Sequence, residues 1–385
     1  MHLDQFLLAL FILLAVSAVA VIVSRRLGLG AVVGLIATGV LLGPSGFGLA
    51  QRVTELREVS ELGIVFLLFL VGLEMQPQHL WARRHLIFGL GSAQVIVTGL
   101  ALALFVVAAR GAGWDAALIL GFGLALSSTA FVLPMLQERG ELDAPHGRAT
   151  LAVLLLQDLA IVPLLALVPL FADQATSMGE GSFGHRLVLV ALGLGAVLAA
   201  GGIALPALLH RLAARGNREG FALLTVAAVV GAAWVMLRVG LSMALGAFLI
   251  GVLLSRLPER HQIEAIVEPF KSVLMGLFFI GVGMLIDLSL LPAVGPLLFA
   301  NLLALLAIKL AVLAALGVAF GLEPRAALRT GLWLAQAGEF AFVLFGAAAA
   351  AGILPPEGIA YAALVISLSM AATPLLARVA DSLGR

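Results

Sequence analysis

Apolar segments of about 20 residues recur along the whole chain, and each is long enough to cross roughly 30 Å of hydrocarbon as a helix. Within lipid, every backbone N–H and C=O must be satisfied inside the chain, which leaves helices and closed barrels as spanning structures. The segments lack the alternating ten-residue pattern of barrel strands. Charged residues make up 11% of the chain, against about 25% in an average soluble domain. The sequence therefore predicts an all-α polytopic membrane protein.

The apolar pattern predicts about 13 transmembrane helices. Their approximate bounds are 6–24, 30–48, 59–75, 86–107, 114–137, 149–171, 187–212, 219–236, 241–255, 269–286, 296–320, 327–351 and 358–376. The chain has no cysteine, which excludes a disulfide or a thiolate metal site. Nothing in the composition indicates a nucleic-acid partner, so the lipid bilayer is the expected environment.

The basic residues test this set of spans, because cytoplasmic loops carry an excess of Lys and Arg. One set of alternate loops holds Arg25, Arg26, Arg83, Arg84, Arg139, Arg148, Arg211, Arg215, Arg218, Arg256, Arg260, Lys271, Arg325, Arg329, Arg378 and Arg385. The opposite set holds Arg52, Arg57, Arg110, Arg186 and Arg238. This bias predicts an N-terminus outside and a C-terminus in the cytoplasm.

Two charges lie in the middle of predicted spans. Asp158, beside Gln157, lies within 149–171, and Lys309 lies halfway along 296–320. A charge at that depth costs a few kcal/mol even on lenient scales, so it is usually kept to hold an ion or a proton. The alternative for Lys309 is a structural role, in which it snorkels to an interface or pairs with a carboxylate.

Two other spans carry polar interruptions at mid-depth. Ser127, Ser128 and Thr129 interrupt span 114–137, and the stretch from Gln336 to Glu339 interrupts span 327–351. Unwound backbone inside a membrane is tolerated where it lines a cavity or is covered by protein, and broken helices in corresponding halves point to a transporter's central site. The alternative is that the hydroxyl groups bond back to the preceding turn and simply pack helices.

The spacing of these features indicates a repeat. Aligning the two interrupted spans places Ser127 on Ala337 and Thr129 on Glu339. Because the two interruptions lie in the fifth and the twelfth predicted spans, the two halves must insert in opposite orientations. We therefore predict an inverted repeat in which two broken helices cross.

Several motifs together resemble a known family. They are Arg26–Gly30 with Gly43–Pro44, Phe69–Glu74, Ala125–Ala130, Leu156–Asp158, Phe278–Met284 and Gln336–Phe342. They resemble the membrane domain of Kef-type potassium efflux systems, in the second monovalent cation:proton antiporter family. The Gln157–Asp158 pair is the most diagnostic, since sodium-selective relatives tend to carry Asp-Asp or Asn-Asp there.

The resemblance implies a particular organisation. The chain, 1–385, would be a single transmembrane transport domain of a homodimer in the bacterial inner membrane. Core helices at about 86–171 and 296–376 would move, in an elevator-like manner, against scaffold and dimer helices at about 6–48 and 187–255. The chain would exchange potassium for protons, without a cofactor and without enzymatic chemistry.

The resemblance also assigns residues. Asp158 would bind the potassium ion or the proton, and Gln157 would shape selectivity. Ser127, Ser128 and Thr129 would offer oxygen ligands at the first break. Lys309 would partner Asp158, and Glu339 would support the second break.

These residue types suit exchange on physical grounds. A desolvated carboxyl group can hold a proton near neutral pH, or it can hold a potassium ion whose shell is completed by neutral oxygens. One carboxylate cannot do both at once, so the two substrates compete. Three other functions stay open, namely sodium:proton antiport, a ligand-gated potassium channel and a non-transporting membrane sensor.

Regulation is a further expectation from the resemblance. Kef systems continue into a cytoplasmic domain that binds nucleotide and responds to glutathione, whereas this sequence ends at Arg385. The segment 261–268 resembles the family's acidic regulatory loop, with Ile266 at an acidic position. A separate or missing regulatory domain is therefore a possible partner, and glutathione control is not predicted from this loop.

Overall fold

The computed structural model describes residues 3–27, 29–43, 46–47, 54–75, 84–171, 183–284, 286 and 291–382. Within these residues the chain forms helices joined by short turns and contains no strand. The prediction of an all-α fold is therefore confirmed for the described part of the chain.

Each predicted span falls on one helix or on consecutive helical segments of the described residues. The elements are α1 (Leu3–Arg26), α2 (Gly30–Leu42), α3 (Thr54–Glu74), a π-helical segment at His85–Gly91 that leads into α5 (Ser92–Arg110), α6 (Trp114–Ala125), α7 (Thr129–Glu138), α8 (Pro145–Phe171), α9 (Phe183–Ala199), a second π-helical segment at Ala200–Ala204, α10 (Leu205–Ala214), α11 (Arg218–Arg238), α12 (Met243–Leu254), α13 (Arg260–Met284), α14 (Leu291–Ala319), α15 (Pro324–Leu334), α16 (Phe340–Ala350) and α17 (Pro356–Ser382). The two spans predicted to be broken are the two that consist of half-helices, α6–α7 and α15–α16.

Seven helices among the described residues are long and apolar enough to cross a membrane. They are His85–Arg110, Pro145–Val168, Val188–Ala214, Arg218–Arg238, Arg260–Met284, Gly295–Ala319 and Glu357–Ser382. Shorter apolar helices accompany them, including the half-helices Trp114–Ala125 and Phe340–Ala350. Helices suit this composition because a helix satisfies its own backbone hydrogen bonds without water.

The chain divides into two compact units. The first comprises Met1–Thr54, Arg83–Leu164 and Phe279–Arg385, and the second comprises Glu55–Ala82 and Leu165–Phe278. The predicted core ranges lie almost entirely in the first unit, and the predicted scaffold range 187–255 lies in the second. The range 6–48, which we expected in the scaffold, clusters with the first unit instead. The functional division into core and scaffold stays a prediction.

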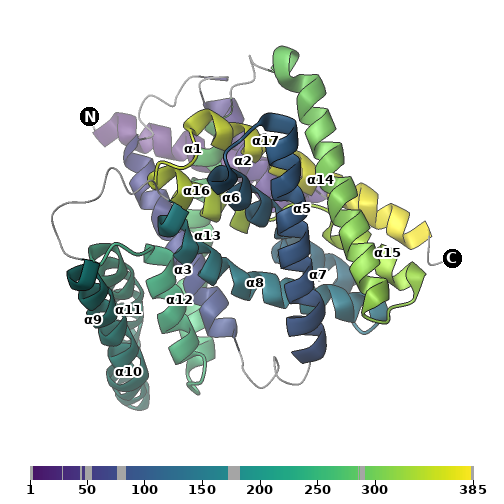
Figure 1. Cartoon of the computed structure of the whole chain (residues 1–385). Helices are drawn as coiled ribbons and strands as arrows, with labels where there is room; N and C mark the ends of the chain where they lie inside the picture. The colour runs from purple at the N-terminus through teal and green to yellow at the C-terminus, as the bar shows by residue number, and fades with distance from the viewer. Residues whose placement is uncertain are drawn as a thin grey trace. The chain divides into compact units, whose positions relative to one another are not determined.

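The first unit contains both broken helices, each packed beside a long apolar helix. α5 lies beside α6, and α14 lies beside α15 (Figure 1). α5 also packs against α14, α6 against α16, and α15 against α17. A cluster of buried side chains from α7, α8, α14, α15 and α17, which includes Leu136, Val153, Leu313 and the fully buried Trp333, forms one core of this unit. The pairing of equivalent helices agrees with the predicted repeat.

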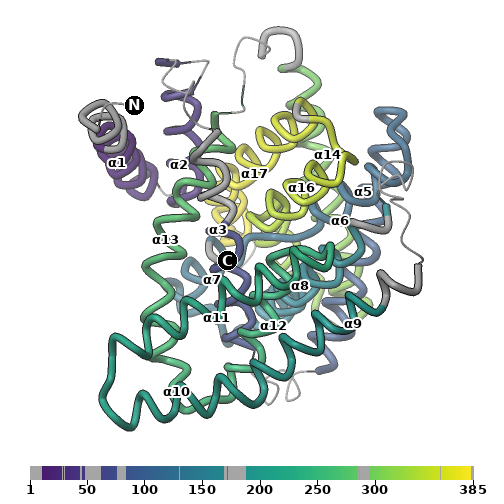
Figure 2. The backbone as a smooth tube through the Cα atoms, turned by 90° about the vertical axis from the view of Figure 1, so that its left-hand side faces the viewer, coloured from purple at the N-terminus to yellow at the C-terminus, as the bar shows by residue number. Residues whose placement is uncertain are grey.

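In the second unit, α9 continues through the π-helical segment into α10, and the chain then returns along α11 (Figure 2). α11 packs against α9, α10 and α12. Buried apolar side chains of α3 and α9 to α13 form one core, which includes Phe69, Leu209, Val229, Met236 and Leu254. This core holds the helices of the unit together by close van der Waals packing.

Helices α3 and α12 approach each other through two glycines. A Cβ atom on Gly72 would overlap the carbonyl oxygen of Phe248, and a Cβ atom on Gly251 would overlap that of Phe69. Small residues let helix backbones pack closely inside a membrane, where lipid tails give no hydrophobic drive for association. The α3–α12 contact therefore depends on glycine at both positions.

We predict that Gly251→Ala lowers the thermal stability of the protein in detergent. The added methyl group must push the two backbones apart, at a cost of about 1–3 kcal/mol. Gly231→Ala on α11 is the matched control, because a Cβ there has no heavy atom within 4 Å and alanine favours a helix. Equal melting temperatures for the two variants would contradict the close approach.

Candidate functional site

At the first broken helix, side-chain amide oxygens accept hydrogen bonds from backbone N–H groups that helical carbonyls would otherwise accept. α6 ends at Ala125, α7 begins at Thr129, and the backbone is extended at Leu126 and Ser128. Ser127 N–H donates to Gln157 Oε1 at 2.8 Å, and Ser128 N–H donates to Gln336 Oε1 at 3.2 Å. Unpaired backbone groups in a membrane interior cost several kcal/mol each, so these amide oxygens make the break possible.

The second break lies against the first. α15 ends at Leu334 and α16 begins at Phe340. Gly338 N–H donates to the carbonyl of Leu126 at 2.9 Å, so one unwound segment hydrogen-bonds directly to the other. A Cβ atom on Gly338 would lie 2.5 Å from the carbonyl carbon of Ser127 and 2.7 Å from the nitrogen of Ser128. The crossing therefore requires glycine at this position.

The two breaks are satisfied in equivalent ways. Ser127 N–H bonds to a side chain of α8, and Ala337 N–H bonds to Ser369 Oγ of α17 at 3.0 Å. Ser127 and Ala337 are the residues that the repeat alignment pairs, and α8 and α17 follow the two broken helices in the same order. Both halves of the chain therefore cap their unwound segment from the next long helix.

Lys309 lies fully buried at the crossing of the breaks. Its Nζ is within hydrogen-bond distance of the carbonyl oxygens of Leu124 (3.0 Å), Leu126 (3.1 Å) and Gln336 (2.7 Å), and of Ser127 Oγ (3.0 Å). These oxygens belong to the C-terminal ends of α6 and α15, where the helix dipoles place partial negative charge. The ammonium group thus balances two helix ends at once. Direct pairing of Lys309 with Asp158 stays a prediction.

Asp158 lies near the N-terminal end of a half-helix, whereas Lys309 lies near C-terminal ends. Thr129, the first residue of α7, donates its hydroxyl to Asp158 Oδ1 at 3.0 Å. The N-terminus of a helix carries partial positive charge and favours a nearby carboxylate. Asp158 is 8% exposed and Thr129 is partly exposed, whereas Gln157, Ser127 and Lys309 are fully buried. Asp158 and Thr129 are thus the members of this hydrogen-bonded group that keep some exposed surface.

Gln157 is fixed by a second amide that the sequence analysis did not single out. Gln157 Nε2 donates to Gln94 Oε1 at 2.7 Å and lies 3.3 Å from the carbonyl of Ala125. Gln94 in turn donates to the same carbonyl at 3.1 Å and to Thr98 Oγ1 at 3.3 Å. The sequence signal for this contact was the presence of Gln94 and Thr98, two polar residues one turn apart inside the apolar span 86–107. The role of Gln157 in selectivity stays a prediction.

The structure therefore brings most of the predicted residues together. Ser127, Ser128, Thr129, Gln157, Asp158 and Lys309 are joined by direct hydrogen bonds or by shared partners. Glu339 occupies the N-cap position of α16 and is 7% exposed, and its side chain makes no capping hydrogen bond to that helix. Its supporting role stays a prediction.

This arrangement has the features of an ion and proton site. The Asp158 carboxylate accepts from the Thr129 hydroxyl at the N-terminal end of α7, and Lys309 Nζ lies against carbonyl oxygens of both breaks. Among the described residues there is no group of three or more His, Cys, Asp or Glu side chains that could hold a metal ion.

Comparisons with known proteins agree with this interpretation. The family described as sodium/hydrogen exchanger, transmembrane, matches residues 11–378. K(+) efflux antiporter 2, chloroplastic, of Arabidopsis thaliana is 43% identical over 355 residues, which cover 90% of this chain and 30% of the relative. K(+) efflux antiporter 1, chloroplastic, of the same plant is 42% identical over 352 residues, with the same coverage. The chain thus spans about a third of the length of these curated relatives.

A solved structure has the same fold. The sodium proton antiporter MjNhaP1 from Methanocaldococcus jannaschii matches with a TM-score of 0.68, and the match covers 100% of both chains. The sequence identity is 15%, so this likeness concerns the fold alone.

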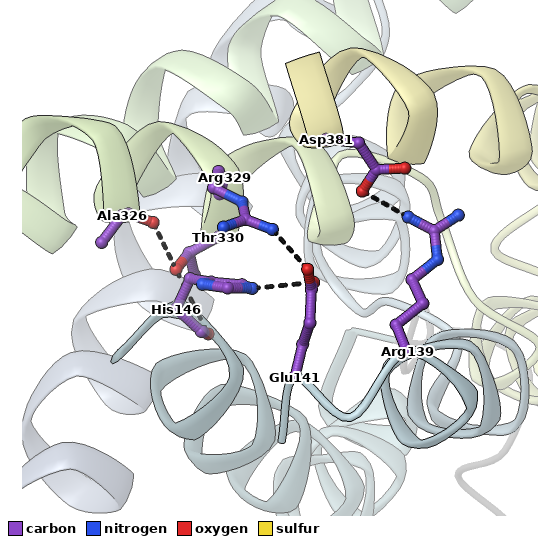
Figure 3. Close-up of polar contacts among 7 residues, drawn as sticks. All are labelled: Arg139, Glu141, His146, Ala326, Arg329, Thr330 and Asp381. Carbon is purple, nitrogen blue, oxygen red and sulfur yellow. Dashed lines mark hydrogen bonds and ion pairs between the residues drawn. The ribbon is translucent and has the colours of Figure 1, made fainter. Parts of the chain in front are cut away.

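A polar cluster at the α7–α8 turn lies apart from these hydrogen bonds (Figure 3). Glu141 binds His146 Nε2 at 3.0 Å and Arg329 of α15 at 2.7 Å, and Arg139 pairs with Asp381 of α17. Burial by itself would raise the pKa of the Glu141 carboxyl, but the hydrogen bonds from His146 and Arg329 and the charge of Arg329 outweigh it, so the pKa lies below its ordinary value. The cluster ties the end of the first broken helix to the second.

We predict that Glu141→Gln lowers thermal stability at pH 7, by about 1–2 kcal/mol, because it leaves Arg329 and His146 without their carboxylate. The pKa of the Glu141 carboxyl is lower in the folded state than in the unfolded state, so the ionised carboxylate stabilises the fold at pH values above the unfolded-state pKa. This stabilisation is lost as the pH falls through the folded-state pKa. The difference from wild type should therefore shrink below a pH of about 4.5. Glu138→Gln, at an exposed position of α7, is the control, and an equal change there would contradict the cluster's role.

Proposed function

We propose, from the premise that this chain belongs to the sodium/hydrogen exchanger family, that it exchanges a monovalent cation for protons across a membrane. Its family is one of transporters and not of enzymes. The observation that carries the proposal is the carboxylate of Asp158, which accepts from the Thr129 hydroxyl at the first of two broken helices that hydrogen-bond to each other.

We propose potassium as the cation, with efflux as the direction of transport. The two plant relatives are named as potassium efflux antiporters, and the Gln157–Asp158 pair is the motif of Kef-type systems. Potassium is a large, weakly hydrated ion that suits a site made of neutral oxygens and one carboxylate. Ser128 and Thr129 would complete its shell together with backbone oxygens.

In the proposed mechanism, the Asp158 carboxylate binds either a proton or the cation. A proton on Oδ1 or Oδ2 removes the charge that attracts the cation, and a bound cation disfavours protonation. The binding of one substrate therefore requires the release of the other, which is the condition for exchange. Lys309 Nζ hydrogen-bonds to carbonyl oxygens of both breaks, so we expect the two breaks to stay together whichever substrate is bound.

Alternating access would follow from movement of the core helices against a scaffold in a homodimer. The first unit holds both broken helices and their hydrogen bonds, which supports their movement as one body. A cytoplasmic domain that binds nucleotide or glutathione would be a regulatory partner. The curated relatives extend well beyond the matched region, which leaves room for such a domain in the proteins of this family.

We place the chain in the bacterial inner membrane, with the N-terminus outside and the C-terminus in the cytoplasm. The motifs resemble those of bacterial Kef systems, although the plant relatives are named as chloroplastic. The orientation rests on the excess of Lys and Arg in one set of loops.

The exchange proposal predicts that purified protein in proteoliposomes dissipates an imposed pH gradient when potassium is added. Asp158→Asn should abolish this flux, because an amide binds neither a proton nor a cation in this way. An equal response to sodium would contradict potassium selectivity, and potassium movement without proton movement would indicate a channel. A silent wild type with intact folding would contradict the proposal and favour a sensor.

The orientation is tested separately with single cysteines, since the chain has none of its own. We expect Ala214→Cys, at the exposed end of α10, to react with a membrane-impermeant thiol reagent from the cytoplasmic side alone. Gly113→Cys, at an exposed turn before α6, should react from the outer side alone. Reaction of both positions from one side would contradict the predicted spans.

A further inference from the structure

Two glutamine side chains, one from each half of the repeat, cover successive N–H groups at the first break. Gln157 of α8 accepts from Ser127 N–H, and Gln336 of the second break accepts from Ser128 N–H. Gln157 is already part of the proposed ion site, because it belongs to the Gln157–Asp158 motif. Gln336 has no assigned role, although it is fully buried at the crossing.

Gln336 links three parts of the crossing. Its side-chain oxygen reaches Ser128 at 3.2 Å, and its backbone carbonyl accepts from Lys309 Nζ at 2.7 Å. Two residues further on, Gly338 N–H bonds to Leu126 at the end of α6. The contact with Ser128 N–H is made by Oε1, which is the acceptor of this amide. Among the described residues, the Nε2 group of Gln336 has no hydrogen-bond partner.

The Ser128 contact lies one residue from the accessible end of the site. Ser128 is the N-cap residue of α7, and Thr129, the next residue, donates its hydroxyl to Asp158 Oδ1. Rotation of the Ser128 peptide would therefore displace the Thr129 hydroxyl from the carboxylate. Gln336 is thus placed to fix the first turn of α7 relative to Asp158.

The contact between Gln336 and Ser128 also affects the electrostatic potential at the position of a bound cation. The first N–H groups of a helix have no helical partner and carry partial positive charge, which attracts anions and repels cations. The Gln336 amide oxygen covers one of these groups, the N–H of the N-cap residue Ser128, and the Gln157 amide oxygen covers the N–H of Ser127, which precedes the cap. The two amide oxygens add partial negative charge beside the N-terminal end of α7, which favours a bound cation beside Thr129.

We propose that Gln336 is a positioning residue of the transport site, whose amide oxygen holds the Ser128 N–H so that Thr129 and Asp158 bind the cation. This inference rests on the proposed exchange function. It adds Gln336 to the second break, where the resemblance assigns a role to Glu339 alone.

The test compares Gln336→Met with Gln336→Glu in potassium-driven proteoliposome exchange. Methionine keeps the volume and loses the acceptor, so the apparent KM for potassium should rise about five- to tenfold, with a smaller change in maximal rate. Glutamate keeps an acceptor oxygen for Ser128 N–H, so its KM should stay closer to that of wild type. Gln137→Met, at an exposed position of α7, is the control with unchanged KM.

Comparison of the KM values of the two variants shows whether Gln336 positions Ser128 or merely fills space. A residue that merely fills space would tolerate Met better than Glu, so a KM for Gln336→Met equal to or below that of Gln336→Glu would overturn the proposal. If Gln336→Met does not fold, Gln336→Asn replaces it, because the shorter amide cannot reach Ser128, and a wild-type KM there would overturn the proposal as well. Exchange by wild type separates this outcome from failure of the antiport function, in which wild type itself is silent.

Discussion

The arrangement of the first unit depends on one constraint, which is that two unwound backbone segments must be satisfied inside a membrane without water. Several of the lost helical bonds are replaced by specific partners. Amides of Gln157 and Gln336 take N–H groups of the first break, Ser369 takes one of the second, and Lys309 takes carbonyl oxygens of both. Polar residues that would be costly in lipid are therefore retained because they complete the backbone. The accessible carboxylate of Asp158 is held at the edge of this network.

Much of this fold could be predicted because a bilayer allows few alternatives. Apolar length located the helices, and polar interruptions located the two breaks, which are the two spans that the structure divides into half-helices. The motifs indicated a cation:proton antiporter family, and the chain belongs to the sodium/hydrogen exchanger family. The cluster of Ser127, Thr129, Gln157, Asp158 and Lys309 was also predictable, because charges and hydroxyls in the middle of apolar spans are expensive to place without a purpose.

The remaining partners were not predictable from pattern alone. Gln94, Ser369 and Gln336 each hydrogen-bond to a backbone group of another segment, and Ser128 and Gln336 are far apart in sequence. No periodicity records such a contact. Glu141 was missed for another reason, since a charged residue in a turn is ordinarily solvated, whereas here it joins His146 to Arg329. The placement of residues 6–48 with the first unit depends on close packing such as that of Gly39 against Ile280, which composition does not encode.

The network also explains why the residue before Asp158 is an amide in this chain. Gln157 accepts from Ser127 N–H and donates to Gln94 Oε1 and the carbonyl of Ala125, so both ends of its amide are used. A carboxylate at that position would accept from Ser127 but has no N–H for Gln94 or Ala125, and two oxygens would then face each other in a buried site. An amide at position 157 and the Gln94 side chain thus form one hydrogen-bonded unit. An effect of Gln157 on ion preference, as proposed above, would therefore act through these hydrogen bonds.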